Sequence, residues 1–201
     1  MQTSIDRAPN AVGAVTENFW NLPNTITLSR IGLTPFLLML SWFEGEAWSA
    51  LMGFGFLAIS LTDLLDGYLA RLHGTESRIG KLLDPLADKL LVMTAFVMLV
   101  AVGRIPAWAL PLVIAILGRE IAVTALRGLA GAEGSAFGAS PLGKWKTGFQ
   151  IAAITALLVH FPLLGLPAHE LGLVLLVIAT VLTVWSGYEY FARYLPDKVR
   201  P

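Results

Sequence analysis

The sequence predicts an all-α fold: a polytopic membrane protein with six transmembrane helices and a short N-terminal interfacial segment. Of its 201 residues, 56% are hydrophobic and only 14% are charged, and the mean hydropathy is +0.70. This balance disfavours a water-soluble globular domain, in which charged residues are more frequent. A helix of about 20 apolar residues crosses roughly 30 Å of hydrocarbon. Six segments of the chain meet that requirement.

The first three helices are expected at 26–43, 48–70 and 81–103. Residues 1–25 precede them as a cytoplasmic or interfacial segment, whose aromatic side chains near residue 20 are suited to head-group depth. Pro35 is expected to bend the first helix. The second helix ends, and the third begins, with a pair of aspartates.

The last three helices are expected at 106–131, 143–165 and 170–194. Residues 26–195 then form one six-helix domain, and residues 196–201 form a cytoplasmic tail. The connections contain the Gly, Pro and Ser residues that favour turns. They are expected at 44–47, 71–80, 104–105, 132–142 and 166–169.

Six crossings place both termini on one side of the membrane, and the basic residues indicate which side. The connections at 44–47 and 166–169 contain neither Lys nor Arg, and that side has only Arg104. Under the positive-inside rule, both termini and any site at the basic end face the cytoplasm, and the cell inner membrane is the expected location. The basic residues on the cytoplasmic side are Arg7, Arg71, Arg78, Lys81, Lys144, Lys146, Arg193, Lys198 and Arg200.

Four aspartates are predicted to meet near the cytoplasmic surface. Asp63 and Asp66 lie in the cytoplasmic half of the second helix, and Asp84 and Asp88 lie in the first turns of the third. Within each pair, a spacing of three or four residues places both carboxylates on one helix face. Because the second helix descends toward the cytoplasm and the third ascends from it, the two pairs reach similar depth.

Four carboxylates held close together repel one another unless they are protonated or neutralised. A hard divalent cation with oxygen ligands is the natural counterion, and Mg2+ or Mn2+ suits such a site. The alternative is that Arg71, Lys81 and Lys89 pair with these acids as buried salt bridges that orient the helices. Ionisable clusters within a membrane usually serve a function, so the pattern favours the metal site.

Residues 63–88 read DLLDGYLARLHGTESRIGKLLDPLAD and fit the pattern D-x2-D-G-x2-A-R-x8-G-x3-D-x3-D at all eight fixed positions. This segment resembles the signature of the CDP-alcohol phosphotransferase family, and a chance match over so many positions is improbable. The resemblance implies an integral-membrane enzyme that joins a CDP-linked lipid to an alcohol and releases CMP. It also implies a homodimer.

The resemblance further implies a role for each matching position. Asp63, Asp66 and Asp84 would bind two metal ions, and Asp88 would be both a ligand and the general base. For the first helix, an Asn/Thr helix cap followed by a snorkelling Arg30 is an equal alternative to a nucleotide contact. The residues expected around the CDP-lipid are Asn24, Thr27, Gly67, Ala70, Arg71, Ser77 and Gly80.

A second group of charges is cationic. Arg119 and Arg127 are eight residues apart on roughly one side of the fourth helix, and Lys144 and Lys146 lie near the same cytoplasmic end. Together they are predicted to bind the phosphate of an anionic acceptor, since guanidinium and ammonium groups bind phosphate well. For the lysines, the alternative is the general accumulation of basic residues on the cytoplasmic side.

Three further segments are most similar to the family members whose acceptor is glycerol 3-phosphate: NLPNTIT at 21–27, GRE at 118–120 and GKWKT at 143–147. The expected partners are therefore CDP-diacylglycerol, glycerol 3-phosphate and membrane lipids, but not nucleic acid. Inositol phosphate, or phosphatidylglycerol for cardiolipin, is the alternative acceptor. A small cation-coupled transporter is an alternative of a different class, although transporter ion sites usually lie at the midplane.

Overall fold

A computed structural model describes residues 22–40, 42–73, 78–132 and 141–199, with side chains at 25, 27–36, 39–40, 42–62, 86–131 and 142–194. The described residues form six α-helices, one at each predicted position, and one short 3-10 helix, η1. The elements are α1 Leu22–Leu40, α2 Glu46–His73, α3 Arg78–Ala101, η1 Ala107–Ala109, α4 Leu110–Ala132, α5 Pro141–Val159 and α6 Ala168–Val199.

Several predicted boundaries were wrong by three to six residues. α1 begins at Leu22 and ends at Leu40 rather than spanning 26–43, and α6 continues to Val199 rather than 194. The connection expected at 71–80 is shorter, because α2 continues to His73 and α3 begins at Arg78. The fifth helix ends at Val159 rather than 165. The residues after Val159 are still largely apolar, but His160 adopts a left-handed backbone conformation with φ of 64°. Pro162 follows two residues later and cannot extend a helix.

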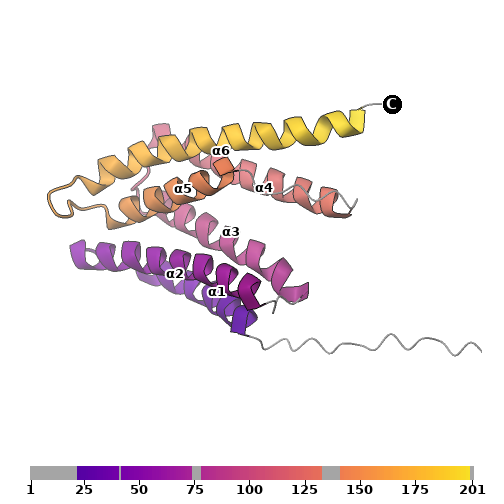
Figure 1. Ribbon diagram of the computed structural model, residues 1–201. Helices are drawn as coiled ribbons and strands as arrows, with labels where there is room; N and C mark the ends of the chain where they lie inside the picture. The colour runs from indigo at the N-terminus through magenta and orange to yellow at the C-terminus, as the bar shows by residue number, and fades with distance from the viewer. Residues whose placement is uncertain (1–21, 41, 74–77, 133–140, 200–201) are drawn as a thin grey trace, which may run out of the picture.

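The helices form two groups joined by α5 (Figure 1). α1 packs against α2 and α3, whereas α4 packs against α6. α5 contacts α2 on one side and α6 on the other, and its contact with α6 is the most extensive in the described chain. Glycines allow these close approaches: a Cβ atom at Gly172 of α6 would lie 2.8 Å from Leu157 of α5.

The hydrophobic core lies toward one end of the molecule. Phe56 of α2, Phe96 and Leu99 of α3, Leu157 of α5 and Leu176 of α6 are fully buried together there. We call this the far end; it carries the α1–α2, α3–α4 and α5–α6 connections. At the opposite end, the aspartate end, α2 ends and α3 begins.

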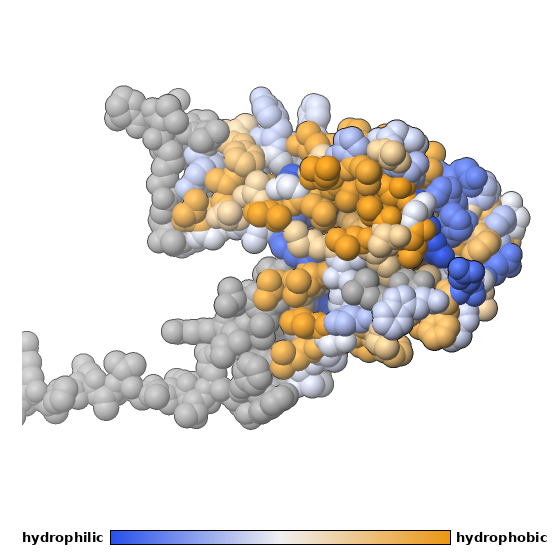
Figure 2. Space-filling view, turned by 180° about the vertical axis from the view of Figure 1, so that it is seen from behind, coloured by the Kyte–Doolittle hydropathy of each residue, from blue (hydrophilic) through white to orange (hydrophobic). Residues whose placement is uncertain are grey.

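The outer surface is strongly apolar. Large hydrophobic side chains are exposed on all six helices, although Trp145 is the one such residue among the described side chains of α5, and hydrophobic residues cover most of the middle of the molecule in Figure 2. A soluble monomer rarely exposes so much contiguous apolar surface. Among the described residues, Ala107–Gly131 and Ala168–Tyr194 are long and apolar enough to cross a membrane.

At the far end, polar contacts bind the helices together. Arg104 donates hydrogen bonds to the Ser49 hydroxyl of α2, at 2.6 Å, and to the carbonyl of Leu158 in the last turn of α5. The Nδ1 atoms of His160 and His169 lie 3.1 Å apart. Arg104 therefore satisfies one of the carbonyls that a helix leaves unpaired at its C-terminus.

Candidate active site

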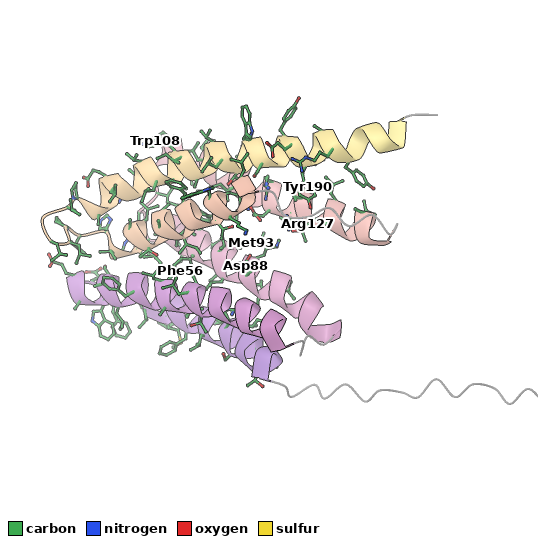
Figure 3. All side chains as sticks on the ribbon, viewed as in Figure 1. Phe56, Asp88, Met93, Trp108, Arg127 and Tyr190 are labelled. Atoms are coloured by element: carbon green, nitrogen blue, oxygen red, sulfur yellow. The ribbon has the colours of Figure 1, made fainter. Side chains whose placement is uncertain are left out.

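Asp88 lies in a small pocket enclosed by α3, α4 and α5. Glu120 of α4 and Lys146, Thr147 and Gln150 of α5 also line this pocket. In Figure 3, Asp88 occupies the side of α3 that is turned toward these two helices. No described side chain forms an ion pair with the Asp88 carboxylate, although Lys89 and Lys146 line the same pocket. Its oxygens are thus available to a ligand.

Glu120 is the anionic centre of a buried charge network. Its Oε1 atom accepts hydrogen bonds from Arg119 Nη1, at 3.2 Å, and from Lys146 Nζ. Lys146 is only 6% exposed. Burial of a charge is costly unless it is paired, so Glu120 stabilises both cations inside the bundle. This network also fixes Lys146 between the Asp88 pocket and the next cleft.

The four predicted acceptor-binding cations line one cleft between α4 and α5. Arg119 and Arg127 come from α4, and Lys144 and Lys146 from the first turns of α5. Lys144 is exposed, whereas Lys146 is buried. The cleft shares Lys146 and Thr147 with the Asp88 pocket. An anion held by the cations would therefore lie next to Asp88.

Residues of α6 contact the two arginines of this cationic cleft. Arg119 Nη2 donates to the Ser186 hydroxyl at 2.8 Å, and Arg127 Nε donates to the Tyr190 hydroxyl at 3.0 Å. The Arg127 guanidinium carbon also lies 4.9 Å from the centre of the Tyr190 ring. Figure 3 shows Arg127 and Tyr190 on facing helices.

The four signature aspartates occupy two levels along their helices. Asp66 lies seven residues before the end of α2, and Asp84 lies six residues after the start of α3. At a rise of about 1.5 Å per residue, both are roughly 10 Å from the α2–α3 connection. Asp63 and Asp88 are each ten residues, or about 15 Å, from it. The side chains of Asp63, Asp66 and Asp84 lie outside the described residues.

The donor set fits a hard divalent cation. Carboxylate oxygens are the ligands that Mg2+ and Mn2+ prefer, and the four aspartates supply no softer atom. The described part of the site agrees, because the Asp88 carboxylate is not neutralised by an ion pair with a described side chain. The alternative was a buried salt bridge between Asp88 and Lys89. Lys89 lines the same pocket, but these two described side chains form no ion pair, so the structure does not support this alternative for Asp88.

The predicted CDP-lipid residues are described only in part. Thr27 is buried, and Arg30, one turn later, is 3% exposed. Arg30 is therefore not a snorkelling side chain, and Asn24 lies within the first turn of α1 rather than preceding it. Gly67, Ala70, Arg71 and Gly80 lie in helices whose side chains there are not described, and Ser77 lies outside the described residues.

Sequence reasoning missed four polar residues of the site. Thr147 and Gln150 line the Asp88 pocket, and Ser186 and Tyr190 contact the arginines. Each pair shares a helix face, at spacings of three and four residues, in an otherwise apolar helix. That spacing was a usable signal, because polar side chains in a membrane helix tend to face the protein interior.

Comparison with known proteins identifies the same family that the signature resembles. A family model described as CDP-alcohol phosphatidyltransferase matches residues 20–185. A Bacillus subtilis protein named CDP-diacylglycerol–glycerol-3-phosphate 3-phosphatidyltransferase is 42% identical over 192 residues, covering 87% of this chain and 95% of its own. A Mycobacterium tuberculosis protein named probable phosphatidylglycerophosphate synthase is 38% identical over 180 residues, covering 88% and 83%. A rice protein named cardiolipin synthase (CMP-forming) is 36% identical over 188 residues, covering 86% and 56%.

Proposed function

This chain belongs to the CDP-alcohol phosphatidyltransferase family, and on that premise we propose that it transfers the phosphatidyl group of CDP-diacylglycerol to glycerol 3-phosphate. The products are phosphatidylglycerophosphate and CMP. Relatives whose names state this reaction cover almost the whole chain. The observation that carries the choice of acceptor is the cationic cleft, which adjoins the Asp88 pocket through Lys146 and Thr147.

The cleft suits a small phosphate monoester. Two guanidinium and two ammonium groups line it, and guanidinium groups bind phosphate oxygens in pairs. A phosphate held there leaves the other end of glycerol 3-phosphate free to extend past Lys146 toward Asp88. An uncharged acceptor would make no use of these cations. Glycerol 3-phosphate therefore fits the cleft better than an alcohol without phosphate.

Asp88 acts as the general base. It accepts the proton of the acceptor hydroxyl as the hydroxyl oxygen forms a bond to the lipid-side phosphorus, while the bond from that phosphorus to the CMP oxygen breaks. A carboxylate is a far weaker base than an alkoxide, so it removes the hydroxyl proton only as the transition state forms. Arg119, Arg127, Lys144 and Lys146 hold the acceptor phosphate and so orient the hydroxyl.

Asp63, Asp66, Asp84 and Asp88 would hold two Mg2+ or Mn2+ ions. When bound, such ions offset the charge of a diphosphate and of its leaving group. Asn24, Thr27, Gly67, Ala70, Arg71, Ser77 and Gly80 would surround the CDP moiety. These assignments rest on the family signature and on the all-oxygen donor set.

All six helices cross the membrane in this proposal. The exposed apolar side chains on all six support it, with fewest on α5, which packs against α2 and α6. With an even number of crossings, the distribution of basic residues supports a cytoplasmic location for both termini and the site, at the cell inner membrane. The homodimer remains an implication of family membership.

An acceptor panel tests the proposed reaction. Purified protein receives CDP-diacylglycerol with glycerol 3-phosphate, inositol phosphate or phosphatidylglycerol, and CMP release is measured with and without a chelator. We expect CMP only with glycerol 3-phosphate, loss of activity with the chelator, and recovery on adding Mg2+ or Mn2+. CMP formation confined to phosphatidylglycerol would instead support the activity named for the rice relative.

A further inference from the structure

Both arginines of the cationic cleft are held by one face of α6. Ser186 contacts Arg119 and Tyr190 contacts Arg127. Gly187 lies on the same face, against the Arg119 side chain. Tyr190 lies one helical turn after both Ser186 and Gly187, so the three residues occupy adjoining parts of the α6 surface that faces α4. None of these three residues belongs to the family signature at 63–88.

The Ser186 hydroxyl has a fixed direction. It donates a hydrogen bond to the carbonyl of Thr183 at 3.1 Å, which leaves its oxygen lone pairs to accept from Arg119 Nη2 at 2.8 Å. Ser186 is only 1% exposed, so water does not compete for this contact. With Nη1 bonded to Glu120, both ends of the guanidinium are constrained.

Gly187 provides the space for Arg119. A Cβ atom at this position would lie 2.9 Å from Arg119 Cγ and 3.4 Å from Nε. The aliphatic stem of Arg119 therefore lies directly on the α6 backbone, and any larger residue would displace it. Because the Arg119 side chain is already ordered, it loses less conformational entropy when it binds an anion than a mobile arginine would.

Tyr190 orients Arg127 in two ways. Its hydroxyl accepts from Nε at 3.0 Å, and its ring lies 4.9 Å from the guanidinium carbon. Because Nε is used by Tyr190, the two terminal nitrogens of Arg127 remain to meet an anion. These are the two atoms whose fork matches two phosphate oxygens.

We infer that Ser186, Gly187 and Tyr190 are positioning residues, which preset the two arginines for the phosphate of the acceptor and so set the affinity for that substrate. The inference rests on the proposed function. It assigns α6, which carries none of the signature residues, a direct effect on acceptor recognition and none on the CDP-lipid.

The test compares Ser186→Ala, Tyr190→Phe and Gly187→Ala with Tyr188→Phe. Tyr188 lies on the same helix but is 74% exposed, so the control removes the same hydroxyl where no arginine depends on it. The measurements are kcat and the KM for each substrate, from CMP release at saturating Mg2+. The shift in thermal unfolding midpoint caused by glycerol 3-phosphate alone gives a second readout.

We expect Ser186→Ala and Tyr190→Phe each to raise the KM for glycerol 3-phosphate about 5- to 10-fold, which lies within the range for the loss of one ordinary hydrogen bond. Gly187→Ala should raise it further. The KM for CDP-diacylglycerol should stay within about twofold, and Tyr188→Phe should match the wild type.

An unchanged KM for glycerol 3-phosphate in Ser186→Ala and Tyr190→Phe would overturn the inference, as would an equal rise in both KM values. A wild-type protein that releases no CMP with glycerol 3-phosphate would overturn the proposed function instead. The thermal shift would still decide the role of α6 in that case: it should be smaller in the variants than in Tyr188→Phe.

Discussion

Asp88 lies in an enclosed pocket, and its carboxylate forms no ion pair with a described side chain. It shares this pocket with Lys89, Lys146 and Glu120. A buried acid in such a position is normally neutralised by a partner. Its arrangement is therefore better explained by a ligand than by helix packing.

Replacing Asp88 by Asn should lower CMP release at least about 100-fold, because general-base catalysis contributes roughly 10²- to 10⁴-fold. The protein should still insert and unfold at a similar temperature, since the amide has the same shape. Glu189→Gln is the matched control, because it makes the same change at a partly exposed acid of α6 that pairs only weakly with Arg193. Near-normal turnover in Asp88→Asn would remove this residue from the mechanism.

Glu120 should stabilise the fold through its two buried partners. In Glu120→Gln, Lys146 loses its counterion at a side chain that is 7% exposed, and breaking a buried pair costs about 3–5 kcal/mol. Adding Lys146→Met to this variant should recover part of the loss, because the orphaned charge is then gone. A double-mutant cycle of unfolding midpoints measures the coupling. Strictly additive effects would contradict a specific Glu120–Lys146 interaction.

The α5–α6 connection shows how a short segment can override hydropathy. The apolar run after Val159 predicted a continuing helix, but the chain turns at His160 and forms a tight bridge between Leu163 and Leu166. Leu164 and Gly165 both have positive φ in this bridge, as in a two-residue hairpin turn. Average hydropathy carries no information on such backbone geometry. The end of α5 can be predicted only from the residues that favour a turn.

His160 in this connection should make stability depend on pH. Burial lowers its pKa below the ordinary value, and the nearby charge of Arg104 and the neighbouring His169 lower it further, against the opposing effect of Glu170. A histidine with a depressed folded-state pKa stabilises the protein above its unfolded-state pKa, which is about 6.5, and that contribution is lost as the pH falls. The unfolding midpoint in detergent should therefore drop between about pH 7 and pH 5.

His160→Asn is the variant that isolates this effect. Asn tolerates the left-handed backbone at this position and does not titrate. The drop in unfolding midpoint on acidification should be smaller in His160→Asn than in the wild type. An identical pH profile in both proteins would show that another group is responsible.

The six-helix layout and its orientation can be tested together, because the chain has no cysteine. Leu164→Cys and Arg193→Cys each introduce the only thiol, the first at the far end and the second near the end of α6. Leu164 is 96% exposed and Arg193 is also exposed. A membrane-impermeant maleimide should label Leu164→Cys in intact cells, and Arg193→Cys only after lysis. Labelling of both before lysis would contradict the proposed orientation.

Helix positions and the gathering of the four cations along one cleft were predictable because their signals are local. Long apolar runs define the helices, and the four cations that line the cleft were identified from their own spacing. The contacts behind them were not predictable. Arg119 and Ser186 are 67 residues apart in sequence, and Arg127 and Tyr190 are 63 apart. Such pairs depend on how α4 packs against α6. This packing cannot be predicted from the hydrophobic periodicity or the composition of a single sequence.

The hydrophobic core and the cationic cleft occupy opposite ends of the same helices. Substitutions in the cleft therefore leave the buried apolar side chains of the far end in place, and distant sites contribute independently to stability. In such a fold, substitutions in the cleft can change the substrate specificity while the packing of the helices stays the same. The relatives fit this separation of core and cleft. Two proteins that are named for different reactions each align with most of this chain.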